Sequence, residues 1–298
     1  MILVTGASGF VGSHVVRELA ERGERVRALV RNARSAAVLD DIDCELVPGD
    51  VTDAASLRAA VDGCTAVVHL VAILVGRPAA FDRVMTQGTA SLLAACRDAG
   101  VERFVQLSAL GTSEQTQDSV PYYHAKWAVE EAVRGSGLSH AILRPSFVFA
   151  GDGGALPELA RITRLAPVTP VIGSGTQRLQ PIWADDLARA VALALGRRDD
   201  LLVELGGPDI VDWNELWSRL KAALGTRRPA LHLPVWLMRP PAALLERLPN
   251  PPLTRDQLRM LQLGDNVVSD GGAGLEALGL RDLLPLDEQL RRSVARPG

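Results

Sequence analysis

A tyrosine and a lysine lie four residues apart in the sequence, at Tyr122 and Lys126. Side chains with this spacing share one face of a helix. A nearby ammonium group favours the phenolate and lowers the pKa of a tyrosine from its free value of about 10. We therefore expect Tyr122 to exchange a proton with a substrate oxygen, with Lys126 lowering its pKa. The alternative is a chance occurrence, since one such pair carries little information alone.

Three glycines near the start of the chain form a second pattern, at Gly6, Gly9 and Gly12. They follow an apolar run at residues 2–4 and precede an apolar helical pattern that begins at Val11. The first glycine lets the chain turn off a strand, the second lets a pyrophosphate approach the backbone, and the third lets the helix pack close. Unpaired N–H groups at the helix N-terminus would face the phosphates. We interpret the pattern as a dinucleotide site; the alternative is a purely structural turn.

Strand and helix patterns alternate through the first half of the chain, and these elements must position both groups of residues. The alternation predicts an α/β fold with a Rossmann-type doubly wound parallel sheet. The expected strands are residues 2–4, 26–30, 45–47, 66–71, 103–107 and 141–143, and the expected helices include 56–61, 81–99 and 122–134.

The second half is less regular and contains more proline and glycine. We divide the chain into an NAD(P)-binding domain, residues 1–150, and a smaller C-terminal α/β substrate-side lobe, residues 151–298, partly interleaved with the first. The expected elements of the second half are helices near 155–165, 186–195 and 212–224 and a strand at 202–205 that returns to the main sheet.

The composition argues against several classes of protein. The 298-residue chain has a net charge of −3, so it lacks the basic field with which proteins bind nucleic acid. Its three cysteines and five histidines have no metal-ligand spacing, so we expect neither a metal site nor a disulfide framework. No apolar stretch reaches membrane-spanning length, and no signal peptide precedes the first strand. We expect a cytoplasmic protein, with a peripheral position at the inner face of the membrane as an alternative.

The glycine pattern, preceded by Thr5, resembles the Thr-Gly-x-x-Gly-x-x-Gly turn of the extended and atypical short-chain dehydrogenase/reductases. Later segments resemble the atypical branch, in particular bacterial relatives of the nucleotide-binding accessory subunit of respiratory complex I. The resemblance implies an NAD(P)-binding protein of the epimerase/dehydratase-like kind. The segments that carry it are residues 95–105, 205–208, 253–257 and 265–268.

The end of the second expected strand bears on the choice of cofactor. An NAD site of this fold has an acidic residue here, which binds the ribose 2′-OH. This chain has Val30 and then Arg31, and an arginine would pair with the 2′-phosphate of NADP. Arg34 could assist. We therefore expect NADP (NADPH) rather than NAD; the alternative is that Arg31 is an ordinary surface charge.

The resemblance also implies the residues of the site. Tyr122 and Lys126 would be catalytic, and Ser108 is the candidate for the serine that holds a substrate carbonyl. Two positions depart from the family, which usually has serine where Ala109 stands and often has asparagine at Met85. The implied cofactor contacts are Gly6, Ser8, Gly9, Phe10, Val11, Gly12, Arg31, Asn32, Asp50, Val51, Leu70, Val71, Ala72, Leu107, Ser108, Tyr122, Lys126, Pro145, Ser146 and Val148.

Three functions remain open. Tyr122 and Lys126 favour an oxidoreductase or epimerase that acts on a carbonyl, quinone or sugar-nucleotide substrate. The missing serine and asparagine favour a non-catalytic NADPH-binding structural or assembly factor for a respiratory or membrane-associated complex, unless Thr112 or Ser113 replaces the serine. The third function is a redox sensor that reports the NADPH/NADP ratio to a protein partner.

Residues 234–248 are apolar except for Arg239, Glu246 and Arg247. Such a segment could dock to a membrane or to a protein complex as an amphipathic surface. The alternative is a helix that packs on the substrate-side lobe. The side chains that would distinguish the two are Trp236, Leu237, Leu244 and Leu245.

Overall fold

The computed structural model of the chain describes residues 1–246, 248, 251 and 253–295. The backbone divides into two units, each assembled from segments that are remote in the sequence. Unit 1 comprises Met1–Pro145, Ala184–Leu205 and Asp270–Arg281, and unit 2 comprises Ser146–Trp183, Gly206–Ser269 and Asp282–Gly298.

Unit 1 is built on a seven-stranded sheet with the strand order β11-β6-β5-β4-β1-β2-β3. Neighbouring strands of this sheet run parallel. This confirms the predicted doubly wound fold and the return of the strand near residues 202–205 to the main sheet. The strands are β1 (Ile2–Thr5), β2 (Val26–Val30), β3 (Glu45–Pro48), β4 (Ala66–His69), β5 (Arg103–Leu107), β6 (Ser139–Pro145) and β11 (Leu201–Leu205).

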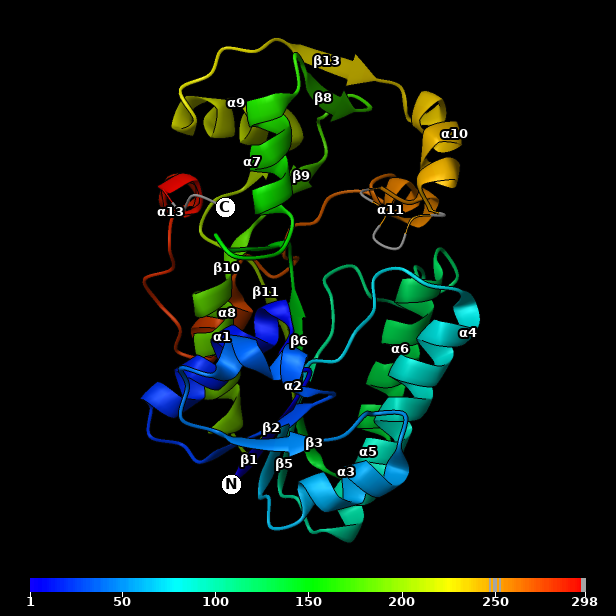
Figure 1. The fold of residues 1–298 in the computed structure, drawn as a ribbon, viewed down its shortest axis with the longest axis vertical. Helices are drawn as coiled ribbons and strands as arrows, with labels where there is room; N and C mark the ends of the chain where they lie inside the picture. The colour runs from blue at the N-terminus through cyan, green and yellow to red at the C-terminus, as the bar shows by residue number, and fades with distance from the viewer. Residues whose placement is uncertain (247, 249–250, 252, 296–298) are drawn as a thin grey trace. The chain divides into compact units, whose positions relative to one another are not determined.

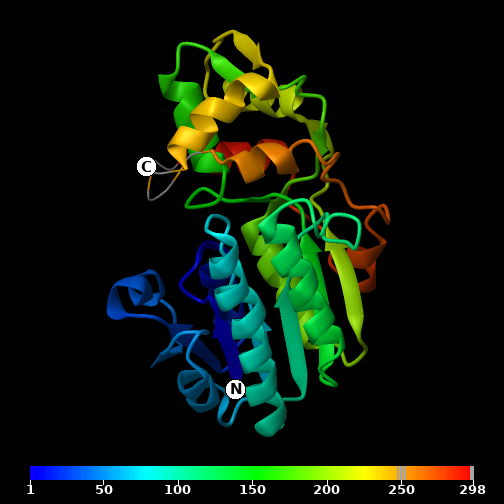
Figure 2. The ribbon, with the colours of Figure 1, turned by 90° about the vertical axis from the view of Figure 1, so that its right-hand side faces the viewer.

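Helices cover both faces of this sheet, as Figure 1 shows: α1 and α8 on one face and α3, α5 and α6 on the other. Figure 2 looks onto the layer that contains α5 and α6. Apolar side chains such as Leu57, Leu92 and Phe104 fill the core between this layer and the strands. The helices of unit 1 are α1 (Phe10–Glu21), α2 (Ala33–Ala36), η1 (Ala37–Leu39), α3 (Ala54–Val61), α4 (Pro78–Phe81), η2 (Asp82–Gln87), α5 (Gly88–Asp98), α6 (Pro121–Arg134), α8 (Ala184–Leu195) and α12 (Ala273–Ala277).

One predicted helix differs from the structure. The pattern at residues 81–99 predicts one continuous α-helix, but the chain forms α4, a π-helical segment η2 and then α5. Met85 lies within η2, and its carbonyl oxygen accepts a hydrogen bond from Thr89 Oγ1 at 2.5 Å. The apolar spacing of the sequence does not distinguish such a widened turn from a regular α-helix.

Unit 2 holds short strand pairs and helices. Its pairs are β7–β10 and β8–β13, which are parallel, and β9–β12, which is antiparallel. None of the described helices of the chain is both long and apolar enough to cross a bilayer. The elements of unit 2 are β7 (Val148–Phe149), α7 (Leu156–Leu165), β8 (Thr169–Ile172), β9 (Arg178–Leu179), β10 (Ile182–Trp183), β12 (Val211–Asp212), α9 (Trp213–Ala223), β13 (Ala230–Leu233), α10 (Val235–Leu245), α11 (Arg255–Met260) and α13 (Leu286–Ala295).

Candidate functional site

The glycine turn joins β1 to α1 and adjoins the end of β4. Gly6 has a φ of +73°, which a residue with a side chain adopts only under strain. A Cβ added at Gly6 would lie 3.1 Å from the carbonyl carbon of Leu70 and from the nitrogen of Val71. The structure therefore brings together three of the predicted cofactor contacts, from two strands that are neighbours in the sheet.

The start of α1 is suited to bind a phosphate group. Gly9 occupies the N-cap position, and no side chain caps the helix there. The free N–H groups of a first helical turn attract anions. A Cβ added at Gly12 would lie 2.0 Å from the Gly6 carbonyl oxygen and 2.7 Å from that of Ala7, so only glycine fits. These residues fit the pyrophosphate of a dinucleotide, which would lie against the backbone of this turn.

The substitution Gly12→Ala is expected to destabilise the protein by about 1–3 kcal/mol, because the added methyl group overlaps rigid backbone. It should also weaken nucleotide binding, since the turn that faces the phosphates must shift. Urea unfolding and nucleotide titration measure the two effects. Gly135→Ala is the control, because its Cβ would lie 3.4 Å from the nearest atom, the Glu131 carbonyl oxygen. Equal behaviour of the two variants would contradict the prediction.

The residues expected at the adenosine end follow β2 and β3. Arg31 is exposed directly after β2. The Asn32 side chain caps α2 by accepting a hydrogen bond from the Ser35 N–H at 2.9 Å. Asp50 Oδ1 accepts hydrogen bonds from the N–H and the hydroxyl of Thr52, at 2.8 and 2.7 Å. Partial burial of Asp50 raises its pKa, but these hydrogen bonds and the nearby positive charge of Arg31 outweigh burial and lower it overall.

The predicted proton-transfer pair lies on α6, where Pro121 occupies the first turn. Both side chains are buried. Lys126 Nζ donates a hydrogen bond to the Leu107 carbonyl oxygen at 2.7 Å, at the end of β5, and lies 5.7 Å from the centroid of the Tyr122 ring. Within the described part of the chain, no residue forms a hydrogen bond with the Tyr122 hydroxyl. That hydroxyl therefore has no partner inside the described protein, as the predicted role in proton transfer requires.

The predicted lowering of the Tyr122 pKa is wrong for this structure. Burial raises the pKa of Tyr122, and the neighbouring Tyr123 raises it further. Burial also lowers the pKa of Lys126 to about 8, although Glu130 opposes the change. The sequence spacing predicts the shared face but not the depth of burial, and desolvation dominates here. Tyr122 therefore carries its proton at neutral pH, as a general acid must.

The buried lysine should make stability depend on pH. The pKa of Lys126 is about 8 in the folded state, and we take its ordinary value of 10.5 for the unfolded state. Between pH 8 and 10.5 the unfolded state therefore binds more protons at Lys126 than the folded state does. Stability then rises with pH, by up to about 1.4 kcal/mol per pH unit. We expect the free energy of unfolding of the wild type, minus that of Lys126→Met, to rise between pH 8 and 10 and to stay flat below pH 8. Urea unfolding across this range tests it, and a flat difference would contradict it.

Ser108 joins a buried charged network that the sequence patterns did not indicate. Its hydroxyl donates a hydrogen bond to Glu130 Oε1 at 2.5 Å. Arg144 binds both oxygens of the same carboxylate, at 2.8 and 2.7 Å, and Arg134 Nη2 lies 2.7 Å from Oε2. Glu130 lies four residues after Lys126, so the helical spacing that groups Tyr122 with Lys126 also extends to Glu130. The hydroxyl proton of Ser108 is thus used inside the protein, while its catalytic role stays a prediction.

Two further polar groups line the ends of the central strands. His69 is fully buried, with Nδ1 2.5 Å from Thr5 Oγ1 and Nε2 2.9 Å from Thr89 Oγ1. Burial lowers the pKa of His69 to about 3, so the ring is neutral and links β1, β4 and α5. The Thr112 hydroxyl, one of the two predicted replacements for the missing serine, is buried and has no partner in the described chain. Ser113, the other, bonds within its own turn to Thr116.

Some predicted cofactor contacts belong to unit 2. Pro145 ends β6 in unit 1, whereas Ser146 and Val148 lie in unit 2. Within unit 2, Ser146 Oγ donates a hydrogen bond to Asn266 Oδ1, and the two oxygen atoms lie 2.6 Å apart. Asn266 belongs to the segment 265–268 that carries the family resemblance, so this contact connects two of the resembling segments.

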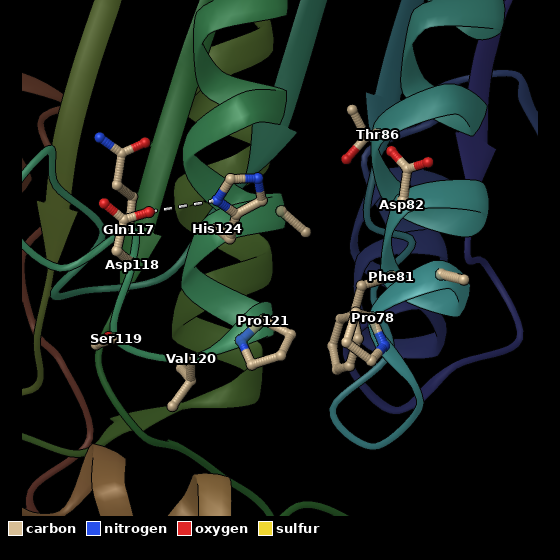
Figure 3. Close-up of a pocket in the computed structure, with 12 residues that line it drawn as sticks. Pro78, Phe81, Asp82, Thr86, Gln117, Asp118, Ser119, Val120, Pro121 and His124 are labelled. Atoms are coloured by element: carbon tan, nitrogen blue, oxygen red, sulfur yellow. Dashed lines mark ion pairs between the residues drawn. The ribbon is translucent and has the colours of Figure 1, made fainter.

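A cavity of about 520 Å³ lies in unit 1 beside the start of α6. Figure 3 shows Pro78 and Phe81 on one side and Pro121 and His124 on the other. The dashed line marks the ion pair between His124 Nδ1 and Asp118 Oδ1, which lie 3.8 Å apart. The side chains of Tyr122, Lys126 and Ser108 are not among its lining residues. The cavity is therefore separate from the predicted proton-transfer group.

The chain belongs to the family of NAD(P)H-binding proteins, which it matches over residues 6–164, and it is an extended short-chain dehydrogenase/reductase-like protein. This confirms the resemblance found in its motifs. Over 238 residues it is 32% identical to the ceramide reductase of Caulobacter vibrioides (strain NA1000 / CB15N), a match that covers 78% of this chain and 74% of that protein.

Two further comparisons extend this relationship. The chain is 30% identical over 224 residues to subunit 9 of the NADH dehydrogenase (ubiquinone) 1 alpha subcomplex of Arabidopsis thaliana mitochondria, covering 72% of this chain and 55% of that protein. The fold matches that of the UDP-glucose 4-epimerase of Thermus thermophilus in complex with NAD, with a TM-score of 0.77 and 22% identity. That match covers 99% of this chain and 97% of the epimerase.

Proposed function

We propose that this chain is an NADP(H)-dependent reductase whose substrate carries a carbonyl, quinone or sugar-nucleotide group. The observation that carries the proposal is the Tyr122 hydroxyl, which has no hydrogen-bond partner in the described chain and lies beside the buried Lys126. A reductase in the family supports the direction of the reaction, because one relative is named a ceramide reductase.

One group of residues would bind the nucleotide, and a second group would transfer the proton. The turn at Gly6, Gly9 and Gly12 would hold the pyrophosphate of NADP(H). The bound nicotinamide would supply the hydride. Tyr122 is protonated, since burial raises its pKa. It gives this proton to the substrate oxygen on which negative charge develops as the hydride is added. The Lys126 ammonium then stabilises the phenolate that remains.

The preference for NADP rests on Arg31, the first residue after β2. Arg31→Ser should raise the Kd for NADP(H) about tenfold and leave the Kd for NAD(H) nearly unchanged, because one exposed charge-assisted contact to the 2′-phosphate is lost. Isothermal titration with both nucleotides measures the change. Arg25→Ser is the matched control, since Arg25 is also exposed but precedes β2, at the opposite end of the strand. A parallel loss of NAD(H) affinity would contradict the proposed contact.

The experiment that tests the proposed function begins with the purified protein. Denaturation releases any nucleotide that co-purifies, and mass spectrometry identifies it. NADPH oxidation is then followed with ketones, quinones and sugar nucleotides, for the wild type and for Tyr122→Phe. Turnover that depends on the Tyr122 hydroxyl supports the reductase, and recovery of NAD alone would overturn the assignment of NADP.

A non-catalytic NADPH-binding role, in the assembly or structure of a respiratory complex, is the second candidate. It is favoured by Ser108, whose hydroxyl proton is given to Glu130, and by Ala109 at the position of the usual catalytic serine. The relative named as a subunit of NADH dehydrogenase is consistent with it. Tight binding of NADPH without turnover, and a melting temperature that rises on binding, would support this candidate.

A further inference from the structure

Three segments of unit 1 meet around Asp50: the end of β2, the end of β3 and the helical segment η2. Arg31 follows β2 directly and Asp50 lies shortly after β3, and the two strands pair in parallel. The Gly49 N–H donates a hydrogen bond to the Val30 carbonyl oxygen at 3.0 Å. Arg31 and Asp50 come directly after these bonded residues, so they leave the sheet side by side.

The third segment, η2, packs against the residue that follows Asp50. A Cβ added at Gly88 would lie 3.2 Å from both the carbonyl oxygen and the Cγ2 atom of Val51. The Gly88 N–H donates a hydrogen bond to the Arg83 carbonyl oxygen, so Arg83 lies one π-helical turn before this contact. Val84, the next residue, packs against the apolar cluster that contains Val51. The fold therefore brings Arg83 to the same end of the strands as Arg31.

The Arg83 guanidinium has no function inside the described protein. Its neighbour Asp82 lines the cavity of Figure 3 together with Thr86, whereas Arg83 is not among the lining residues. Asp82 accepts a hydrogen bond from Gln87 Nε2 at 2.6 Å. Arg83 and Arg31 are both exposed, and neither side chain forms a hydrogen bond or an ion pair with a described residue.

The electrostatics of Asp50 place both arginines near its carboxylate. Burial raises the pKa of Asp50, whereas hydrogen bonds from Thr52 and the positive charges of Arg31 and Arg83 lower it overall. The effect of one charge on another falls with distance, and salt screens it beyond about 10 Å. The Asp50 Oδ1 atom is already held by the N–H and the hydroxyl of Thr52. The two arginines therefore flank a carboxylate with which neither of them pairs.

The balance of charge explains why one arginine would not be sufficient here. The negative charge of Asp50 offsets that of Arg31, so these two side chains alone would present a nearly neutral surface to an anion. Arg83 makes the group of three net positive, and arginine is suited to bind phosphate oxygens. A ribose 2′-hydroxyl is uncharged and gains little from this excess, whereas a 2′-phosphate is attracted to it.

We propose that Arg83 binds the 2′-phosphate of NADP(H) together with Arg31, so that η2 helps to select NADP over NAD. The proposal rests on the NADP(H) binding proposed above and adds a residue that is far in the sequence from the end of β2. Arg31 would donate hydrogen bonds from the strand end and Arg83 from η2.

The test is isothermal titration of the full chain with NADPH and with NADH. Arg83→Gln should raise the Kd for NADPH about tenfold and leave that for NADH nearly unchanged, because one charge-assisted contact is lost. Arg83→Lys keeps the charge and should recover part of this loss. The loss should shrink between about 0.05 and about 0.5 M salt, since salt screens exposed charges. Arg97→Gln is the matched control, because Arg97 is exposed in the last turn of α5 and has no ion-pair partner in the described chain.

A second titration isolates the adenosine end of the nucleotide. Adenosine 2′,5′-bisphosphate and adenosine 5′-monophosphate lack the nicotinamide, and Arg83→Gln should weaken binding of the bisphosphate alone. Circular dichroism melting confirms that the variants fold. Unchanged affinity of Arg83→Gln for NADPH would overturn the proposal. Equal losses for NADPH and NADH would also overturn it, because the contact would then be to a part that both nucleotides share.

These measurements separate the proposal from the proposed function, because none of them depends on turnover. If Arg31→Ser removed the preference for NADPH and Arg83→Gln did not, the assignment of NADP would stand and the role of Arg83 would be excluded. A wild type that binds NADPH no more tightly than NADH would overturn both.

Discussion

Replacement of Tyr122 by phenylalanine is expected to lower turnover by about 10²–10⁴-fold, the usual contribution of a positioned general acid. The substitution removes one hydroxyl and leaves the buried ring beside Lys126. No described residue of the chain bonds that hydroxyl, so its loss should leave stability nearly unchanged. Steady-state kcat and KM with the substrate found in the panel, together with NADPH titration, measure these quantities.

The adjacent tyrosine provides the control. Tyr123 is buried on the same helix, with its ring centroid 5.6 Å from that of Tyr122. Its hydroxyl donates a hydrogen bond to the Leu110 carbonyl oxygen at 3.3 Å. Tyr123→Phe should therefore cost about 1 kcal/mol of stability and leave turnover close to wild type. If both variants kept full turnover, Tyr122 would not be the proton donor.

Removal of the Glu130 carboxylate is expected to have the largest effect on stability. Its side chain is completely buried and holds Arg144, Arg134 and the Ser108 hydroxyl. Glu130→Ala leaves the guanidinium of Arg144 without its partner in a site that is 11% exposed. An uncompensated buried charge costs about 3–5 kcal/mol, and urea unfolding should show a loss of this size.

A neighbouring glutamate separates burial from pairing. Glu131 lies 2.5 Å from Arg134 Nη1, but its side chain is 56% exposed. Glu131→Ala removes an ion pair with the same arginine and should cost about 0–1 kcal/mol, because solvent screens the pair. Equal losses for Glu130→Ala and Glu131→Ala would show that the buried network does not stabilise unit 1 in the proposed way.

Local sequence patterns were sufficient for the nucleotide-binding half of the fold. The apolar run at residues 2–4 and the three glycines correspond to β1, the turn and α1. The spacing at Tyr122 and Lys126 placed both side chains on α6. These features depend on neighbours within about four residues, so the chain encodes them locally. The sequence did not predict the π-helical segment η2, because the spacing of apolar residues alone does not distinguish a π-helical turn from an α-helix.

Other parts of the site depend on contacts between distant segments. Ser108 follows β5, Glu130 lies on α6 and Arg144 on β6, and the folded sheet brings them within hydrogen-bond distance. The sequence offered the spacing of Glu130 but no reason to connect it with the other two. The side of helix α10 that is buried was likewise open, because an apolar helix can bury either of its sides.

The backbone turn of the nucleotide site was therefore already decided by the residue types, since only glycine permits the φ of Gly6 and the packing of Gly12. Tertiary structure decided the chemistry that surrounds it. It buried Tyr122 and Lys126 so deeply that desolvation outweighs their mutual charge effect, and it bound the Ser108 hydroxyl to Glu130. A pKa and a hydrogen bond depend on which atoms remain in contact with water, and this is known only once distant parts of the chain have packed together.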